Sequence, residues 1–213
     1  MTLPVVLGFD TSAAHSGAAL FQGGDVVSAL YEDMAKGQAE RLMPMLEEVL
    51  TEAGATWQDL DRIGVGVGPG NFTGIRISVS AARGLALGLG IPAVGVSLLD
   101  ALAYDQTEPT LACLDAPRGS YFLKGFNGAP LPEPAFHTTL PTLPQGLLCI
   151  GTAAAEIAAI TGGQHVPAHY APASAIARIA ARATVTPGER PAPLYLRAAD
   201  AKPSSQPIPK ILP

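Results

Sequence analysis

Residues 63–89 read IGVGVGPGNFTGIRISVSAARGLALGL, and this stretch decides the fold class. An apolar run at 63–67 is typical of a strand, and it leads directly into the glycine-rich turn 68–74. Residues 75–89 then follow as a predicted helix. Small residues lie four apart on this helix in two pairs, Ser78 with Ala82 and Gly84 with Gly88. Because such residues carry almost no side chain, another helix can approach closely along this strip.

The chain before this stretch predicts strands and an amphipathic helix. Short apolar runs at 4–9, 17–21 and 26–31, with a tight-turn signal at 22–25, indicate three antiparallel strands. Residues 38–53 carry apolar side chains at helical spacing, and Gly54 ends the pattern. The members of that stripe are Leu42, Met45, Leu46, Val49, Leu50 and Ala53. Pro44 either marks the first turn of this helix or kinks a longer one.

The chain after this stretch is less regular. A strand at 91–95 and a helix at 98–103 are expected, and the composition changes after Tyr104. Further strands are predicted within 110–126 and at 147–150, and Ala-rich helices at 153–160 and 173–183. Five prolines between 130 and 144 and a Pro-rich tail at 202–213 leave little room for regular structure. We therefore expect one lobe at 1–103 and a reduced second lobe at 104–213, whose last segment can return to the first.

The composition favours an assembled, soluble protein. Hydrophobic residues make up 48% of the 213 residues and charged residues 15%, against about 25% charged in ordinary soluble proteins. A lasting subunit interface accounts for this balance, although an Ala-rich core gives the same statistic. The net charge of −5 and the absence of basic runs argue against direct tRNA binding. Neither a signal peptide nor a bilayer-spanning run is recognised, so a cytoplasmic location without membrane contact is expected.

Two segments are candidate phosphate- or nucleotide-facing sites. A carboxylate and two hydroxyls follow the first predicted strand, and the glycine-rich turn precedes a helix whose free N–H groups can face an anion. The candidate residues are Asp10, Thr11, Ser12, Gly68, Gly70, Thr73 and Gly74. From the local residues alone, a solvated turn and an ordinary glycine turn are the favoured explanations, since no Lys-Ser or Lys-Thr follows the glycines.

No catalytic or metal-binding set can be assembled from the sequence. His165 and His169 are four apart but straddle Pro167, which disrupts the helix needed to place both on one face. Cys113 lies in an apolar run without a basic neighbour, as expected of a core residue rather than a nucleophile. The serine motif G-x-S-x-G is absent. We predict no catalytic residue, no metal and no cofactor.

Taken together in order and spacing, these segments resemble the TsaB (YeaZ) family, a Gcp-like group. The segments that match are Asp10-Thr11-Ser12, Glu40-Arg41-Leu42-Met43-Pro44, GPGNFTGIR at 68–76, Asp115-Ala116 with Arg118, and Tyr195-Leu196-Arg197. The segment at 68–76 is the specific one. The likeness is strong over 1–103 and loose thereafter. Asn71 replaces the usual Ser, and Gly119-Ser120 replaces an acidic residue.

The resemblance implies an α/β, actin-like fold of the ASKHA and ribonuclease H-like kind. Its expected form has two lobes, with a mixed five-stranded sheet in the first and a reduced second. The catalytic sister protein, TsaD, carries a metal-binding H-x-x-x-H motif after the strand at 91–95. Leu98 and Leu102 stand at the corresponding positions here. Since leucine offers no lone pair to a metal, the resemblance implies a non-catalytic chain.

The function that the resemblance implies is that of a partner subunit in tRNA threonylcarbamoyladenosine synthesis. Such a subunit binds and stabilises TsaD, works with the ATPase TsaE through the complex, meets tRNA only through it, and can also pair with itself. The first two helices of the family pack across the interface as heterodimer or homodimer. The corresponding interface residues are Leu42, Met43, Met45, Leu46, Val49, Ile75, Ser78, Ala82 and Leu85. The alternative is that they are the ordinary core of one lobe.

Two rival functions belong to other classes. An actin-fold ATP-dependent phosphotransferase or ATPase would use Asp10 and the turn 68–74 on ATP. A protease, a label attached to the wider family, has little support because neither a metal pair nor a catalytic triad is present.

Overall fold

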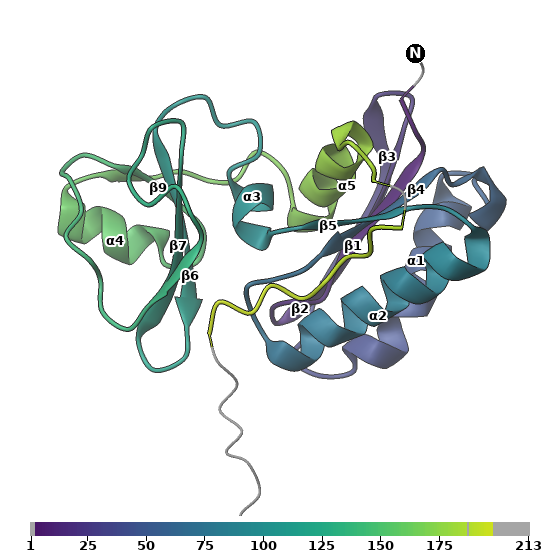
Figure 1. Cartoon of the computed structure of the whole chain (residues 1–213), viewed down its shortest axis with the longest axis horizontal. Helices are drawn as coiled ribbons and strands as arrows, with labels where there is room; N and C mark the ends of the chain where they lie inside the picture. Colours follow the sequence, from purple (N-terminus) through teal and green to yellow (C-terminus); the bar gives the residue numbers. More distant parts are fainter. Residues whose placement is uncertain (1–2, 187, 198–213) are drawn as a thin grey trace, which may run out of the picture.

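The apolar strands at the start of the chain form a mixed five-stranded sheet. The structure, a computed structural model, describes residues 3–186 and 188–197. β1 (Val6–Asp10), β2 (His15–Gln22) and β3 (Asp25–Asp33) pair antiparallel, and β4 (Arg62–Gly66) and β5 (Ala93–Val96) add parallel strands beside β1. The strand order is β3-β2-β1-β4-β5. Figure 1 shows this sheet in the lobe that also carries the N-terminus.

Helices cover both faces of this first sheet. α1 (Gln38–Glu52) and α2 (Phe72–Leu89) lie side by side on one face, and α5 (Pro172–Arg182) lies on the other (Figure 1). A short 3-10 turn at Trp57–Asp59 precedes β4. The apolar stripe of α1 and the inner side of α2 pack on the sheet in one hydrophobic cluster with Leu7, Phe9 and Ile63. The core of the first lobe therefore lies between these two helices and the strands.

The Ala-rich helix α5 approaches the sheet more closely than a bulkier helix can. A Cβ at Gly8 would lie 2.7 Å from the Cβ of Ala177, and one at Gly64 would lie 2.9 Å from the Cβ of Ala180. Small side chains on the helix thus meet glycines in β1 and β4. Although α5 follows the second sheet in sequence, it packs on the first.

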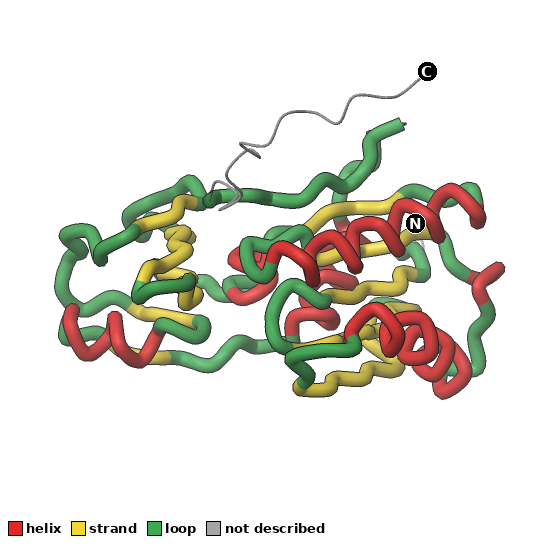
Figure 2. Tube along the Cα trace, turned by 90° about the horizontal axis from the view of Figure 1, so that it is seen from below, coloured by secondary structure: helices red, strands yellow, loops and turns green. Residues whose placement is uncertain are grey.

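The second lobe is built on another five-stranded sheet. Its strands are β6 (Thr110–Ala116), β7 (Ser120–Phe126), β8 (Ala135–His137), β9 (Leu148–Ile150) and β10 (Gln164–His165). The strand order is β10-β9-β6-β7-β8. α4 (Ala154–Thr161) packs on one side, and α3 (Leu98–Leu102) lies between the lobes. Figure 2 shows the two lobes side by side along the long axis.

The end of the described chain crosses back over the first lobe. We call residues 189–197 the C-terminal strap. Its Leu194 N–H donates to the Val67 carbonyl at 2.8 Å, and Arg83 Nε donates to the Pro191 carbonyl at 2.7 Å. Arg76 Nε donates to the hydroxyl of Tyr195 at 3.1 Å. The strap therefore connects α2 to the residue that follows β4.

The predicted fold class is confirmed, with two mixed sheets in an actin-like two-lobe α/β arrangement. The strands β8 and β10 were not predicted, and α2 begins three residues earlier than expected. Pro44 lies inside α1. The predicted tail at 202–213 lies outside the described residues. Among the described helices, none has the length and hydropathy needed to cross a bilayer.

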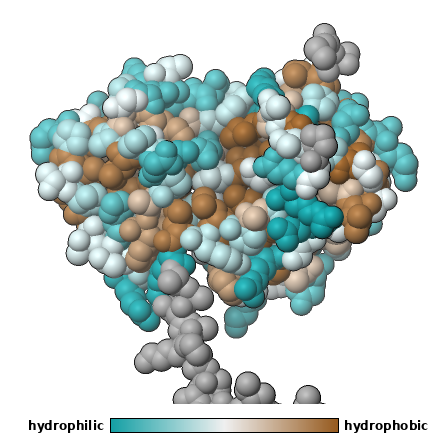
Figure 3. All heavy atoms as spheres, in the orientation of Figure 1, coloured by the Kyte–Doolittle hydropathy of each residue, from teal (hydrophilic) through white to brown (hydrophobic). Residues whose placement is uncertain are grey.

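Hydrophobic side chains also reach the surface, in keeping with the low charge content. Figure 3 shows them on both lobes and near the junction between them. The large exposed ones are Leu3, Val27, Tyr31, Met43, Phe72, Leu87, Ile160 and Tyr195. That the low charge content reflects a subunit interface stays a prediction. The exposed apolar residues are the places where such an interface can be sought.

Candidate functional site

The first residues of the turn after β1 are buried, whereas Ala14 at its tip is exposed. Asp10, Thr11 and Ser12 have no exposed surface, and His15 at the start of β2 is 6% exposed. Ser12 Oγ donates to Asp10 Oδ2 at 2.9 Å, and His15 Nε2 lies 2.8 Å from the same oxygen. The other carboxylate oxygen, Oδ1, is buried and has no hydrogen-bond partner among the described residues. The carboxylate of this candidate residue therefore bonds neighbouring side chains through Oδ2, whereas Oδ1 has no hydrogen-bond partner among the described residues.

Gly66 in β4 makes room for this carboxylate. A Cβ at that position would lie 1.9 Å from Asp10 Oδ1, well inside van der Waals contact. The imidazole of His15 stacks on Tyr31 of β3 with ring centroids 5.2 Å apart. Three adjacent strands thus hold the Asp10 side chain in place.

The glycine-rich turn packs directly onto this enclosed turn. The N–H of Asn71 donates to the Ser12 carbonyl at 2.6 Å, and Thr11 Oγ1 donates to the Gly74 carbonyl at 2.7 Å. A Cβ at Gly70 would lie 2.1 Å from the Ser12 oxygen, and one at Gly74 would lie 1.9 Å from the Thr11 oxygen. The glycines allow backbone to meet backbone, so the two predicted segments contact each other.

The N-terminus of α2 is capped by its own chain. Asn71 Oδ1 accepts hydrogen bonds from the N–H groups of Thr73 at 2.9 Å and Gly74 at 3.0 Å. These are donors that a helix start offers to an anion when no side chain takes them. A phosphate at this end would have to displace Asn71, the residue that departs from the usual Ser of the motif.

Gln38 is a further constraint that the sequence analysis missed. Its side-chain amide donates to the carbonyls of Ala13 and His15, each at 2.7 Å. The first residue of α1 therefore fixes the backbone of the turn between β1 and β2, in addition to the contacts from the glycine-rich turn. A glutamine at a predicted helix start carries no sequence signal for this contact, because the partners are backbone carbonyls more than twenty residues earlier.

The predicted interface residues are mostly core residues, and this is a correction. Seven of them are at most 1% exposed: Leu42, Met45, Leu46, Val49, Ile75, Ser78 and Ala82. Leu85 is partly buried, and only Met43, at 39%, is exposed. The reason is geometric, because an apolar stripe on a helix turns toward the largest apolar surface available, here the sheet. The enclosed seven cannot meet a partner while this lobe stays folded.

The outward sides of the same two helices carry a different set of residues. We call this set the helix-pair surface: Met43, Pro44 and Glu47 of α1 with Ser80, Gly84 and Gly88 of α2, all of them exposed. A Cβ built on Gly84 or on Gly88 would meet no atom of the described residues within 4 Å, apart from the helix's own backbone. The smooth strip that the sequence predicts on α2 thus includes two glycines that border open space, whereas Ser78 and Ala82 face the core.

The two cysteines, and the two leucines that stand where TsaD carries its metal ligands, are packing residues in this structure. A hydrogen bond with Cys149 and burial raise the pKa of the Cys113 thiol, which keeps it neutral and unreactive. Leu98 is buried between the lobes, and Leu102 is partly buried in the same cluster. Within residues 3–186 and 188–197, no group of three or more His, Cys, Asp or Glu side chains is placed to hold a metal ion.

Comparison with known proteins gives consistent matches. A family model described as "TsaD: tRNA N6-adenosine threonylcarbamoyltransferase" matches residues 31–125. An uncharacterized protein of Mycobacterium tuberculosis is 33% identical over 208 residues, which cover 94% of this chain and 95% of that protein. The tRNA threonylcarbamoyladenosine biosynthesis protein TsaB of Escherichia coli is 34% identical over 122 residues, 55% of this chain and 52% of its own length.

A solved structure matches nearly the whole chain. It is an uncharacterized protein with similarity to peptidase YEAZ from Pseudomonas aeruginosa, with a TM-score of 0.74, 27% identity, and coverage of 92% of this chain and 100% of that chain. The sequence match therefore extends through both lobes, and the fold match does as well. The chain belongs to the TsaB (YeaZ) family.

Proposed function

We propose that this chain is a non-catalytic partner subunit in tRNA threonylcarbamoyladenosine biosynthesis, which binds and stabilises a TsaD-like catalytic subunit. The TsaB relatives named for that biosynthesis support the pathway. The partner role rests on one observation above the others. The helix-pair surface is exposed and smooth, with two glycines whose open side meets no other part of the described chain.

The residues of this surface suit the docking of a helix from another subunit. Gly84 and Gly88 lie one turn apart and let a partner backbone approach closely. Met43 supplies a flexible thioether that adapts to more than one partner. The same surface would then hold either a TsaD-like subunit or a second copy of this chain, each burying on the order of 1,600 Å² in total. The TsaE-like ATPase and the tRNA would be engaged through the assembled complex.

The contacts of the turn after β1 favour a partner-subunit role over phosphotransfer from a nucleotide. An ATP-dependent phosphotransferase would need Asp10 and the turn 68–74 to face a nucleotide. Here Asp10 contacts Ser12 and His15, and the donors at the start of α2 contact Asn71. A nucleotide site would require these contacts to open.

The test is a pair of charge substitutions on exposed apolar residues. Met43→Glu places a carboxylate on the helix-pair surface, and Ile160→Glu places one on α4 of the second lobe, where Ile160 is 58% exposed. Both variants should melt like the wild type, because neither side chain lies in a core. Met43→Glu should weaken association with the TsaD-like subunit at least about tenfold, since a desolvated carboxylate without a partner is costly. Ile160→Glu should leave association unchanged.

Size-exclusion chromatography with light scattering and a calorimetric titration measure the association. A second variant, Gly84→Trp, places a bulky side chain on the same surface. If Met43→Glu and Gly84→Trp both assembled normally, the interface would lie elsewhere and the proposal would be contradicted. Titration with Mg-ATP tests the rival function on the same samples. Tight binding followed by hydrolysis in the isolated chain would favour the phosphotransferase instead.

A further inference from the structure

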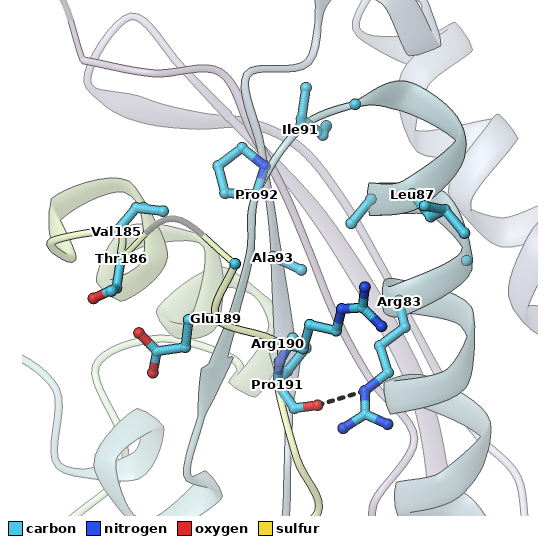
Figure 4. A pocket seen from close by; sticks show the side chains of 14 residues that line it. Arg83, Leu87, Ile91, Pro92, Ala93, Val185, Thr186, Glu189, Arg190 and Pro191 are labelled. Atoms are coloured by element: carbon cyan, nitrogen blue, oxygen red, sulfur yellow. Dashed lines mark hydrogen bonds between the residues drawn. The ribbon is translucent and has the colours of Figure 1, made fainter.

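A pocket of about 560 Å³ lies at the far end of α2 from the enclosed Asp10 turn. One wall is the second half of α2 with the residues leading into β5, and the other is formed by Val185, Thr186 and Gly188 with the first residues of the C-terminal strap (Figure 4). Volumes of roughly 300–1,000 Å³ are typical of sites for small molecules. Because α2 and α5 are more than eighty residues apart in sequence, this pocket is a product of the fold rather than of a local motif.

The interior of this pocket is largely apolar. Leu87, Ile91 and Pro92 line the α2 side, and Val185 and Pro191 line the other. Leu87 is 81% exposed, although leucine gains free energy when its surface leaves water. An apolar body in the pocket would cover this side chain.

Two arginines from opposite walls also line the pocket. Arg83 comes from α2, and its Nε donates to the Pro191 carbonyl at 2.7 Å, which directs the guanidinium toward the strap. Arg190 comes from the strap itself. In Figure 4 both side chains extend into the space between α2 and the strap, whereas the carboxylate of Glu189 points away from them.

Neither guanidinium forms an ion pair with a carboxylate of the described residues. The ion pairs of the described residues involve Asp10, Asp25, Glu32, Glu48 and Asp100, and none includes Arg83 or Arg190. Two like charges on one pocket repel each other, and an anion between them would relieve that repulsion. Arginine also binds carboxylates and phosphates with two parallel hydrogen bonds.

We propose that this pocket binds a small organic anion, with its carboxylate or phosphate between Arg83 and Arg190 and its apolar body against Leu87, Ile91 and Val185. The bonds from the guanidiniums fix the charged end, and the apolar walls select the attached chain. The pocket shares Gly84 with the helix-pair surface, so the two regions are neighbours on α2. Neither Asp10 nor the turn 68–74 lines the pocket, so its occupation does not require the Asp10 turn to open.

Two fluorescent probes of similar shape and different charge test the proposal on the full chain. Anilinonaphthalene sulfonate carries the anion, and phenylnaphthylamine lacks it. The wild type should bind the sulfonate probe at least about tenfold more tightly than the neutral one, because a guanidinium forms charge-assisted hydrogen bonds with the anion and not with the neutral probe. Arg190→Gln should remove that preference and leave the affinity for the neutral probe unchanged. Leu87→Ser should weaken both probes.

Lys36→Gln is the matched control, because it removes one positive charge from an exposed loop outside the pocket. It should keep the wild-type preference. Competition with octanoate and octyl phosphate, with octanol as the neutral reference, distinguishes a carboxylate site from a phosphate site. Equal loss of sulfonate binding in Arg190→Gln and Lys36→Gln, equal affinity of the wild type for both probes, or competition by octanol as strong as by both anions would each overturn the proposal.

Discussion

The glycines at the two ends of α2 have opposite surroundings. At the N-terminal end, a Cβ on Gly70 or Gly74 would lie about 2 Å from a carbonyl oxygen of the turn after β1. In the second half, Gly84 and Gly88 have no neighbouring atom within 4 Å of that position. The first pair is required by contacts within the chain. The second pair is not required by anything in the described structure.

This difference separates a closed end of α2, whose glycines are packed against the chain itself, from an open end, whose glycines face unoccupied space. Glycine inside a helix is less stable than alanine by roughly 0.5–1 kcal/mol. Gly84 and Gly88 therefore lower the stability of α2 without an internal packing benefit. Close approach by another chain is the benefit that the proposed function supplies, and substitutions along α1 and α2 test this contrast.

The largest effect is expected from a charge on the closed side of α1. Leu46 has no exposed surface and lies in the main cluster of the first lobe. Leu46→Asp should cost at least about 4 kcal/mol, because it removes apolar contacts and buries a carboxylate without a partner. Such a loss is a large part of the stability of an ordinary domain, about 5–15 kcal/mol. Thermal melting followed by circular dichroism should show a collapsed or absent transition.

Met43→Asp on the same helix is the matched control for this variant. Met43 is 39% exposed, so the same new charge stays in water and the melting transition should be retained. If Leu46→Asp kept the wild-type transition while losing partner binding, Leu46 would be an interface residue and its assignment to the core would be wrong.

The next largest effect should come from the closed end of α2. Gly74→Ala would place a methyl group 1.9 Å from the Thr11 oxygen, and a backbone oxygen cannot move aside cheaply. We expect a loss of about 3 kcal/mol, at the upper end of ordinary overpacking. Urea unfolding gives the free energy. An unchanged unfolding midpoint would mean that the turn after β1 is free to move, and the site there would not be closed as described.

The first lobe could be predicted well because its signals are local. The stripe of α1 and the turn before α2 both follow from short-range patterns, and the structure confirms the helices and strands that they predict. What the stripe does not specify is its partner. The residues from Leu42 to Val49 suit a sheet or a second subunit equally, and only the long-range packing of the strands assigns them to the core.

The second lobe and the enclosed turn show the other limit of local patterns. β8 and β10 contain three and two residues, too few to produce an alternation. Asp10 is enclosed by His15 of β2 and Gly66 of β4, and Gln38 of α1 bonds the backbone of His15. No short motif encodes that arrangement, so the local sequence favoured a solvated turn, with a phosphate site as the alternative.

A smaller effect of opposite sign is expected at the open end of α2. Gly84→Ala and Gly88→Ala should each stabilise the isolated chain by roughly 0.5–1 kcal/mol, since the added methyl group enters open space and restricts the unfolded chain. Urea unfolding of the single and double variants checks this. If the proposed partner packs on this strip, Gly84→Trp should fold normally and fail to assemble. A loss of stability in either alanine variant would show that the strip is already covered within the chain.

The smallest effect concerns the charged flank of α1 that faces β3. Arg41 donates to Glu32 at 2.6 Å and to Glu48 at 2.7 Å, and these hydrogen bonds lower the pKa of both carboxyl groups. A carboxylate whose folded-state pKa is lowered contributes stability above the ordinary pKa of glutamate, about 4.3. That contribution disappears as the pH falls through the lowered pKa. Because the three groups are in contact with water, the effect should be small.

Arg41→Gln should therefore be slightly less stable than the wild type at neutral pH, and the two proteins should converge as the pH falls below about 4. Lys36→Gln removes the same charge without these partners and should follow the wild type throughout. Urea unfolding at several pH values measures the difference. A gap between Arg41→Gln and the wild type that stays constant in acid would mean that Arg41 acts through packing of its aliphatic stem on α1, and that this flank belongs with the closed regions of the lobe rather than with its solvated surface.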